Sequence, residues 1–472
     1  MLVIFFSVNA IIAPKKLLEV GNLETIILAA GKGTRMKSKL PKVLHKVCGK
    51  PMLQHVIDAA KSAGSSREVV VIGNGAELVK EKISGVEFVL QAEQLGTGHA
   101  VLCAKENFSA SQGDLMILCG DTPLVTADLL KKLSDAHNNS QAAATVLSAE
   151  LEDATGYGRI IREADGSFKK IVEHKDATDA EKNIREVNAG IYCFDIQKLF
   201  SALSQIKNDN AQGEYYLPDA LKVLKNAGEK ISVFVAEDFT ATLGINSRVQ
   251  LAEAERILRQ RKNFELMDSG VTIIDPATTY IDSEVEIGQD TIIYPNTYLE
   301  GATKIGADCE IGPDTRFQNM TVGDNVQIQF SYCHDSEIES GVIMGPYVHI
   351  RPGSKISAKV KIGNFVEVKN STIGEGSKLP HLQYIGDTDM GAGCNMGCGT
   401  ITVNYDGKTK FRTKIGDNVF VGCNSNLVAP VTLEDGVYVA AGSTITKDVP
   451  QNNLAVARSR QTNIENWADK RK

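Results

Sequence analysis

An aliphatic residue recurs at every sixth position along most of the second half of the chain. Three stretches keep this phase, beginning at Ile287, Ile338 and Ile415, and a small or polar residue usually follows each aliphatic one. A period of six fits neither an α-helix nor a half-buried strand. It is typical of a parallel β-solenoid, in which three hexapeptides make one coil and the aliphatic residues stack inward. We expect the two interruptions, at 313–321 and 401–414, to project as loops.

The first half of the chain alternates short apolar runs with longer segments of helical spacing. The apolar runs predict strands, at 25–29, 68–72 and 115–118. The helical spacing predicts helices, at 52–63, 128–136 and 248–269. Such alternation indicates a mostly parallel sheet covered by helices, and ligands of these sheets bind beyond the carboxyl ends of the strands.

These patterns predict four parts: a tail over 1–22, an α/β domain over 23–247, a linking helix over 248–270, and the solenoid with a C-terminal tail over 271–472. The first tail is partly apolar, but no basic residue precedes its apolar run as in a signal peptide. The run is also shorter than the ~20 residues that cross a membrane. We expect an appended tail, with a membrane anchor as the alternative.

Composition narrows the function classes. The 472 residues are 43% hydrophobic and 23% charged, as in ordinary globular proteins. A net charge of −7 argues against binding to nucleic acid or to a membrane surface. The nine cysteines have no framework spacing, so we expect reduced thiols in the cytoplasm rather than disulfides. Cys394 and Cys398 lack a second pair of matching spacing, and we expect no zinc site there.

A glycine-rich turn follows the first predicted strand, in the motif LAAGKGTRMKSKLPKVLHKVCGKPML at 28–53. Gly31 and Gly33 allow backbone N–H groups to approach a phosphate or a base. Arg35 and Lys42 can neutralise a polyphosphate. The motif is neither a Walker A sequence nor a dinucleotide fingerprint, because the lysine and glycine spacings differ. A plain tight turn between strand and helix is the alternative.

Two further segments favour a nucleotide site over a plain turn. QAEQLGTGHA at 91–100 is a polar, glycine-rich turn suited to the edge of a base. LMILCGDTPL at 115–124 places Asp121 just beyond a buried strand. A carboxylate at that place, beside a polyphosphate, is a natural ligand of Mg²⁺.

Together with the hexapeptide half, these segments resemble the bacterial bifunctional UDP-N-acetylglucosamine pyrophosphorylase/glucosamine-1-phosphate N-acetyltransferase family. The resemblance covers about residues 23–468, and further motifs occur in the family's order: TGYGRI (155–160), VEHKDAT (172–178), VNAGIY (187–192) and NAQGEYYLPD (210–219). It implies a Rossmann-like α/β nucleotidyltransferase domain with a mixed sheet, followed by a left-handed parallel β-helix. It also implies a cytoplasmic homotrimer that acts on small molecules.

The resemblance implies that the first domain transfers UMP from UTP to N-acetylglucosamine-1-phosphate. The products would be pyrophosphate and UDP-N-acetylglucosamine, a precursor of peptidoglycan and lipopolysaccharide. Asp121 and Asn246 would bind Mg²⁺. Cys119 stands where the family usually has an aromatic residue, so we expect its backbone alone to serve. The residues that would hold nucleotide and sugar are Leu28, Ala29, Ala30, Gly31, Lys42, Gln91, Gly96, Thr97, Cys119, Gly120, Gly158, Glu173, Asn188 and Asn246.

The solenoid carries a second set of polar residues. Arg351, Lys369 and Tyr384 form a credible phosphate cradle, and a neutral histidine such as His381 can take a proton from an attacking amine. The resemblance implies acetyl transfer from acetyl-CoA to glucosamine-1-phosphate, with His381 as base. Its product would be the substrate of the first domain. Asn395, Asn404 and Tyr405 would hold sugar or acetyl groups, and Cys398, Cys423, Ala441 and Arg458 would line the CoA groove.

Two alternatives remain open at this point. In one, the chain is a pyrophosphorylase whose β-helix is only a trimerisation scaffold, because Cys398 and Cys423 replace the usual Ala and Ser and Pro380 precedes the histidine. In the other, the chain is a non-enzymatic scaffold or nucleotide sensor. Intact Lys42, Asp121 and Asn246 argue against that second alternative.

Overall fold

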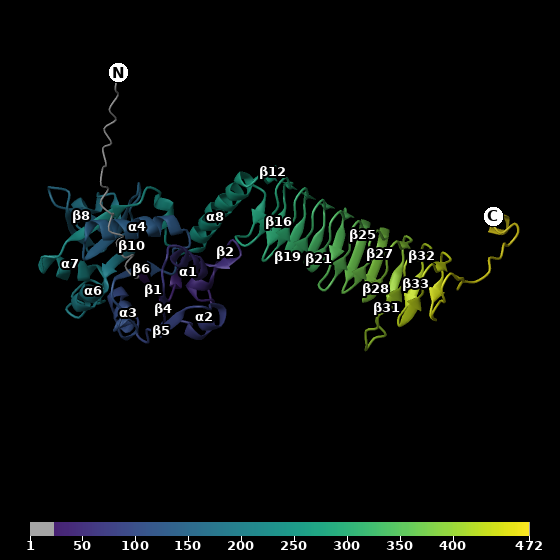
Figure 1. The fold of residues 1–472 in the computed structure, drawn as a ribbon, viewed down its shortest axis with the longest axis horizontal. Helices are drawn as coiled ribbons and strands as arrows, with labels where there is room; N and C mark the ends of the chain where they lie inside the picture. Colours follow the sequence, from purple (N-terminus) through teal and green to yellow (C-terminus); the bar gives the residue numbers. More distant parts are fainter. Residues whose placement is uncertain (1–22, 472) are drawn as a thin grey trace, which may run out of the picture. The chain divides into compact units, whose positions relative to one another are not determined.

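The computed structural model describes residues 23–471, and the tail expected over 1–22 lies outside the described residues. By internal contacts, residues 23–47 and 51–254 form one compact unit, and residues 48–50 and 255–471 form a second (Figure 1). The division falls within helix α8 (Arg248–Asp268), the helix expected over 248–269. The domain boundaries at 247 and 270 stay predictions.

A mixed nine-stranded sheet lies at the centre of the first unit. Strand β1 (Leu23–Ala29) is parallel to its neighbours β4 (Glu68–Ile72) and β6 (Asp114–Cys119), which confirms the three predicted strands. The remaining strands are β5 (Glu87–Leu90), β7 (Ala144–Glu150), β8 (Arg159–Arg162), β9 (Phe168–Val172), β10 (Glu186–Asp195) and β11 (Ile231–Val235). Since β10 runs antiparallel to both β6 and β7, the sheet is mixed, as the resemblance implies.

Helices cover this sheet with amphipathic faces. On α1 (Met52–Ser62), the buried residues Leu53, Val56, Ile57 and Ala60 recur at helical spacing. The helix α4 (Ala127–Ser140) begins at the N-cap Thr126, whose hydroxyl accepts from Leu129 N at 3.3 Å. The other helices are α2 (Ala76–Lys82), α3 (Thr97–Cys103), α5 (Asp179–Lys182), α6 (Ile196–Leu203) and α7 (Pro218–Asn226). Two apolar cores result, one on each face of the sheet.

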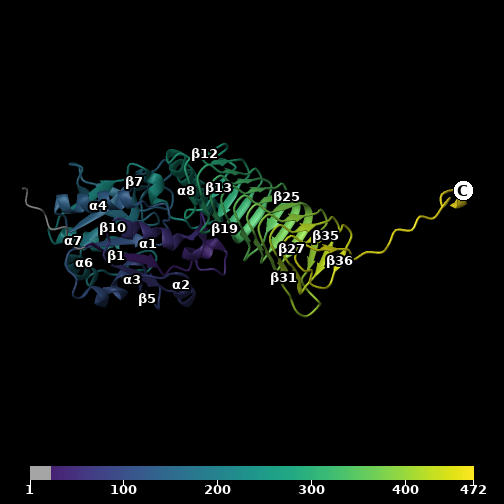
Figure 2. The same cartoon turned by 45° about the vertical axis from the view of Figure 1, so that its right-hand side comes forward.

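The second unit is a left-handed parallel β-helix of short strands stacked coil upon coil (Figure 2). Early coils repeat every eighteen residues, because β14 (Glu286–Ile287) pairs with β17 (Lys304–Ile305). The hexapeptide aliphatic residues point inward and form one continuous core. Asn263 of α8 is buried at the first coil and donates to the carbonyl of Pro276 at 3.1 Å.

The prediction of a projecting loop at 313–321 is wrong. Residues 316–322 form strand β19 (Arg316–Val322), which stays in the wall and pairs with β21 (Tyr332–Ile338). Arg316 pairs with Tyr332, sixteen residues on, so the phase shift in the sequence comes from a shortened coil rather than an insertion. Asn319 turns the corner inside β19 with a φ of 51°.

The other expected loop is confirmed. Asp389 pairs with Lys414, twenty-five residues on, so this coil holds seven residues more than an eighteen-residue coil. The extra residues project beside β31 (Thr413–Ile415), where Tyr405 and Lys410 form an antiparallel bridge across the loop (Figure 2).

Candidate active sites

A cavity of about 450 Å³ opens in the first unit at the carboxyl ends of β1, β5 and β6. Its lining includes most of the residues expected to hold a nucleotide: Leu28, Ala29, Ala30, Gly31, Lys42, Gln91, Gly96, Thr97 and Cys119, together with the expected metal ligand Asp121. Three separate loops therefore converge on one cavity, as the order of the strands requires.

The glycine-rich turn has two different requirements for glycine. Gly33 has a φ of 59°, and a Cβ there would lie 2.5 Å from Cβ of Lys42. A Cβ at Gly31 would have no protein atom within 4 Å. Gly33 therefore allows Lys42 to pass the turn, whereas the space beside Gly31 is open to a ligand.

Lys42 joins the two residues expected to bind Mg²⁺. Its ammonium group donates to Asp121 Oδ2 in a short ion pair and to Asn246 Oδ1 at 2.5 Å. The chain segment that carries Asn246 is fastened to the same strand end, because Ile245 N donates to the carbonyl of Asp121 at 2.8 Å. A carboxylate oxygen and an amide oxygen thus converge on one cation, which is a donor set that suits Mg²⁺.

The segment 91–100 is held by its own polar groups. Gln91 Nε2 donates to the carbonyl of Gly96 at 3.1 Å. Thr97 Oγ1 accepts from Leu217 N at 3.0 Å. A Cβ at Gly96 would lie 2.5 Å from the carbonyl oxygen of Tyr215, so only glycine fits there.

The three residues expected to hold the sugar lie together. Gly158 accepts from Asn188 N at 2.9 Å, and a Cβ on Gly158 would lie 3.2 Å from Glu173 Oε1. Burial raises the pKa of Glu173, and the nearby carboxylates of Asp176 and Asp219 raise it further. The charged form of the Glu173 carboxyl group is therefore disfavoured in this poorly hydrated place.

Cys119 and Gly120 end strand β6 beside the turn. Gly120 N donates to the carbonyl of Leu28 at 2.9 Å, which ties the two strand ends together. Burial raises the pKa of Cys119 to about 12, and the carboxylate of Asp121 raises it as well. The thiol is thus neutral, so the cysteine contributes packing rather than nucleophilic chemistry.

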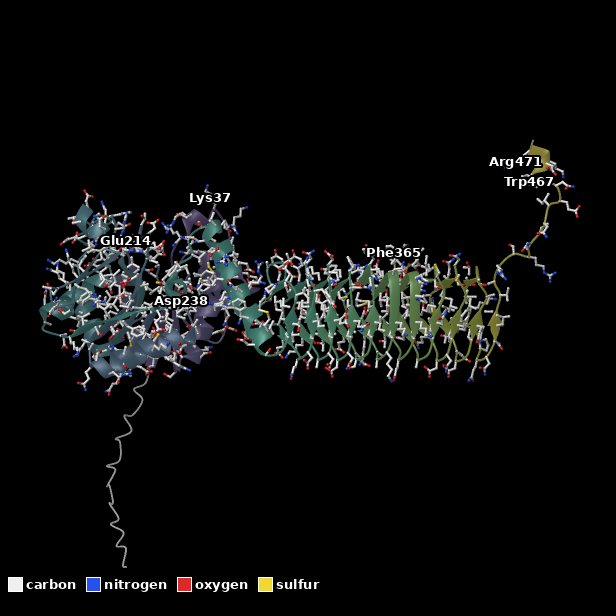
Figure 3. All side chains as sticks on the ribbon, turned by 90° about the horizontal axis from the view of Figure 1, so that it is seen from above. Lys37, Glu214, Asp238, Phe365, Trp467 and Arg471 are labelled. Atoms are coloured by element: carbon white, nitrogen blue, oxygen red, sulfur yellow. The ribbon has the colours of Figure 1, made fainter. Side chains whose placement is uncertain are left out.

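Sequence reasoning missed several residues of this cavity. Glu214, labelled in Figure 3, and Gln94 line it, and Gln94 Nε2 donates to the carbonyl of Gln91 at 3.0 Å. Glu214 lies in the quoted motif NAQGEYYLPD, which was the available signal. Gln94 lies in the quoted segment QAEQLGTGHA, but nothing in the sequence singles it out from its neighbours.

The expected phosphate cradle of the second unit is built from cations paired with carboxylates. Arg351 Nη1 lies 2.8 Å from Glu367 Oε1, and Lys369 Nζ lies 3.5 Å from Asp387 Oδ2. Burial alone would raise the pKa of Asp387, but hydrogen bonds from Asn370 and Asn404 and the ammonium of Lys369 outweigh it and lower the pKa. Asp387 is therefore an anion that holds Lys369 in place.

Tyr384 and Asn404 belong to the same cluster. Asn404 Nδ2 donates to Tyr384 OH at 3.4 Å and makes a short hydrogen bond to Asp387. Asn395, on β29 (Asn395–Met396), pairs with Lys378 of the coil before it. Among the described residues, no hydrogen bond joins the side chain of Asn395 to this cluster.

His381 is exposed on β27 (Lys378–Gly386), directly above Asn364 of β25 (Lys361–Lys369). Its Nδ1 lies 2.8 Å from Asn364 Oδ1. An amide oxygen can only accept, so this contact places the proton on Nδ1 and leaves Nε2 as an acceptor. Asn364, which sequence reasoning missed, fixes the tautomer. Pro380 fits within the same extended strand.

The projecting loop brings a further cation to the cluster. Contact with the ammonium of Lys369, and more weakly the charge of Arg351, lowers the pKa of Lys410. Lys410 is bridged across the loop to Tyr405, whose hydroxyl donates to the carbonyl of Gly407 at 2.7 Å. Three cations thus crowd together, an arrangement typical of an anion site.

The residues expected to line the CoA groove form a column. Cys398, Cys423 and Ala441 occupy the same corner of three successive coils, because Asn424 N donates to the carbonyl of Cys398 at 2.7 Å and Gly442 N to that of Cys423 at 2.8 Å. Arg458 Nη1 donates to the carbonyl of Ala441 at 2.7 Å. The four residues are thereby brought together on one edge of the β-helix.

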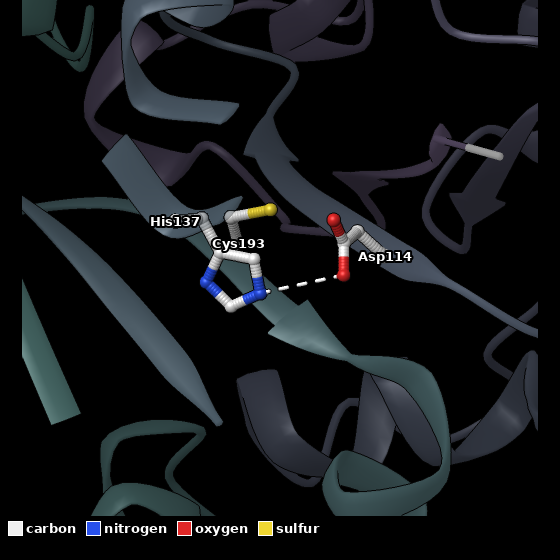
Figure 4. A group of neighbouring side chains, drawn as sticks. All are labelled: Asp114, His137 and Cys193. Atoms are coloured by element: carbon white, nitrogen blue, oxygen red, sulfur yellow. Dashed lines mark ion pairs between the residues drawn. The ribbon is translucent and has the colours of Figure 1, made fainter. Parts of the chain in front are cut away.

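Asp114, His137 and Cys193 form a separate group in the first unit (Figure 4). His137 contacts Thr145 Oγ1 through Nδ1 at 2.9 Å and Asp114 Oδ1 through Nε2 at 3.4 Å. Both ring nitrogens have partners, so the group serves the core of the sheet. Cys394 is equally internal, with its thiol 3.1 Å from the carbonyl of Gly416.

Two protein-family models match the chain, one within each unit. The MobA-like NTP transferase domain matches residues 25–209, and the bacterial transferase hexapeptide (six repeats) matches residues 412–447. Within residues 23–471, no helix is long and apolar enough to cross a membrane.

Full-length relatives are also similar. The chain is 56% identical over 449 residues to the Bifunctional protein GlmU of Clostridium perfringens (strain SM101 / Type A), which covers 95% of this chain and 98% of that relative. It is 55% identical over 446 residues to the Bifunctional protein GlmU of Geobacillus thermodenitrificans (strain NG80-2), covering 94% and 97%. That of Halalkalibacterium halodurans is 53% identical over 451 residues, covering 95% and 99%.

A nucleotidyltransferase unit followed by a hexapeptide acyltransferase unit defines a two-part transferase. With identity above one half along nearly the whole length, the chain belongs to the GlmU family of bifunctional proteins. It is therefore an enzyme with both a nucleotidyltransferase and an acyltransferase activity, rather than a scaffold or a pyrophosphorylase alone.

Proposed function

We propose that the cavity of the first unit binds UTP and N-acetylglucosamine-1-phosphate and joins them with release of pyrophosphate. The residues present fit a Mg²⁺ ion, because Asp121 and Asn246 offer oxygens that already converge on a cation. When bound, the ion would neutralise phosphate charge. The side chain of Lys42 would then turn from these oxygens toward the phosphates.

No side-chain nucleophile is needed for this reaction. The phosphate oxygen of the sugar phosphate attacks the α-phosphorus of UTP, and pyrophosphate leaves. The backbone N–H groups around Gly31 would hold the nucleotide, while Lys42 balances the charge that develops on the phosphates. Glu173, Asn188 and Gly158 would orient the sugar, and the hydrogen bond from Asn188 to Gly158 supports a preformed pocket.

The second unit would acetylate glucosamine-1-phosphate with acetyl-CoA. Nε2 of His381 would take a proton from the attacking 2-amino group, since Asn364 occupies the other ring nitrogen. Arg351, Lys369 and Lys410 would bind the phosphate of the sugar. The column from Cys398 to Ala441 would hold the CoA chain, with Arg458 near its phosphates.

One observation carries the two-activity proposal: His381 with a fixed tautomer lies on the same coils as a cluster of cations, in a different unit from Lys42 and Asp121. We also propose a homotrimer, because hexapeptide solenoids of this family assemble in that way. A cytoplasmic location suits enzymes that consume UTP and acetyl-CoA.

A coupled assay with glucosamine-1-phosphate, acetyl-CoA and UTP tests the proposal. From glucosamine-1-phosphate and UTP, we expect UDP-N-acetylglucosamine to form only when acetyl-CoA is present. From N-acetylglucosamine-1-phosphate and UTP, we expect it to form without acetyl-CoA. If N-acetylglucosamine-1-phosphate gave product but glucosamine-1-phosphate with acetyl-CoA gave none, the result would instead support a pyrophosphorylase with a β-helix scaffold.

A further inference from the structure

Cys398 and Cys423 lie in register on neighbouring coils of the β-helix. The residues two positions before them pair directly, Met396 with Val421. The backbone hydrogen bond from Asn424 N to the carbonyl of Cys398, 2.7 Å long, continues this register through the corner. Stacked strands are about 4.8 Å apart, and disulfides join Cα atoms about 4.4–6.8 Å apart.

Both side chains leave the same kind of corner. The residues that follow them, Gly399 and Asn424, have left-handed φ values of 74° and 55°. Matching backbone conformations in register project the two thiols in the same direction, one above the other. Cys423 is exposed and Cys398 is half-buried, so both can be reached from solvent.

The other cysteines of the described chain differ from this pair. Burial raises the pKa of the thiol in all seven of them: Cys48, Cys103, Cys119, Cys193, Cys309, Cys333 and Cys394. Cys103 is half-buried on α3 and lies beside His99 rather than beside a second cysteine. An accessible pair stacked in register therefore distinguishes the corner of the predicted CoA groove.

We propose that Cys398 and Cys423 form a reversible disulfide that closes the acetyl-CoA groove, an inference that rests on the acetyl-CoA site proposed above. The oxidant is a small-molecule disulfide. The thiolate of the more exposed Cys423 attacks one sulfur of that disulfide, forms a mixed disulfide and releases one thiolate. The thiolate of Cys398 then attacks Sγ of Cys423, forms the internal disulfide and releases the second thiolate. Two protein thiols are oxidised and one small disulfide is reduced to two thiols.

The position of the bond determines its effect. Ala441 is the next member of the column, and Arg458 is fastened to its carbonyl. A disulfide between these two coils, next to Ala441, would replace two free thiols by one rigid bridge on the wall of the groove. Strands stacked about 4.8 Å apart are spaced slightly wider than the roughly 3.5–4.5 Å between the Cβ atoms of an ordinary disulfide, so the bond should be strained and easily reduced.

The test treats the full-length protein with glutathione disulfide and measures both activities. We expect most of the acetyl transfer to be lost and dithiothreitol to restore it, while uridylyl transfer stays constant as an internal control. Peptide mass mapping should find Cys398 linked to Cys423, with the loss of two hydrogen atoms. Prior addition of acetyl-CoA should slow the reaction.

Variants separate the pair from other thiols, each compared with its own reduced activity. Cys398→Ala and Cys423→Ser should each abolish the reversible loss, and the control Cys103→Ser should retain it. A stable mixed disulfide on Cys423 alone, or a mapped Cys398–Cys423 bond that leaves acetyl transfer unchanged, would overturn the proposal. Absence of acetyl transfer in the reduced protein would count instead against the proposed function, and mass mapping would still decide whether the pair bonds.

Discussion

Lys42 and Asn246 are 204 positions apart in the sequence, yet Lys42 Nζ lies 2.5 Å from Asn246 Oδ1. The same ammonium group forms an ion pair with Asp121. Two oxygens that contact a lysine ammonium group can also bind a metal ion, because the ammonium group and the metal ion are both cations. The contact therefore links the turn after the first strand to the metal site proposed at the end of β6.

Replacing the carboxylate of Asp121 should separate the two activities. We expect Asp121→Asn to lower kcat/KM of uridylyl transfer roughly 100-fold or more, since charge stabilisation of transferring phosphates is a large catalytic contribution. Acetyl transfer should not change, because His381 belongs to the other unit. Removing Mg²⁺ with EDTA should have the same selective effect. Equal loss of both activities would show that the variant misfolds.

Gly31 offers a test of close approach by the nucleotide. A Cβ at Gly31 meets no protein atom within 4 Å, so Gly31→Ala should leave Tm nearly unchanged. Its methyl group should still raise KM for UTP, by about tenfold if one backbone contact is lost. Gly33→Ala is the contrast, because its φ of 59° and its contact with Lys42 should also lower Tm. An unchanged KM in Gly31→Ala would remove this turn from the nucleotide site.

The strongest sequence signals were those of repeated burial. The period of six predicted the β-helix because every coil buries the same inward column, from Ile287 onward. The two interruptions of the repeat predicted the structure less well, because a shortened coil and an inserted loop both shift the positions of the aliphatic residues. Thus 313–321 is largely strand β19, whereas 401–414 projects.

Single side chains outside motifs could not be predicted. Asn364 is seventeen residues before His381, and only the coil length of the β-helix brings the two into register. Lys410 reaches the cation cluster because the loop folds back through its bridge with Tyr405. Both depend on coil geometry, which a sequence pattern gives only approximately.

The pairing of His381 with Asn364 predicts a pH effect on acetyl transfer. His381→Ala should lower kcat about 10²–10⁴-fold, the usual contribution of a general base. Asn364→Ala should lower kcat less, because the ring is present but not oriented. Asn364→Asp should retain activity and shift the acidic limb of the pH–rate profile upward, since a carboxylate stabilises the imidazolium. An unmoved profile in Asn364→Asp would show that the contact does not act on the base.

Lys410 should act in binding more than in chemistry. We expect Lys410→Ala to raise KM for glucosamine-1-phosphate roughly tenfold with little change in kcat, as loss of one charge-assisted contact does. Lys408→Ala, an exposed lysine on the same loop, is the matched control. High salt should weaken the difference between the two variants. Equal KM values for both would place Lys410 outside the phosphate site.

Replacing Glu173 by glutamine should stabilise the protein but weaken substrate binding. Because burial, Asp176 and Asp219 raise the pKa of Glu173, the folded state prefers the protonated form more than the unfolded state does. The contribution of Glu173 to stability therefore becomes unfavourable as pH rises from the unfolded pKa of 4.5 through the folded pKa, and it remains unfavourable at pH 8.

The substitution Glu173→Gln should raise Tm at pH 8 by about 2–4 °C and should change Tm little at pH 5. Tm here is that of the unfolding transition of the first unit, which can be recognised because added UTP raises its temperature. KM for N-acetylglucosamine-1-phosphate should rise meanwhile. The exposed Glu152→Gln should change neither, and a lower Tm in Glu173→Gln at pH 8 would contradict the unfavourable burial of Glu173.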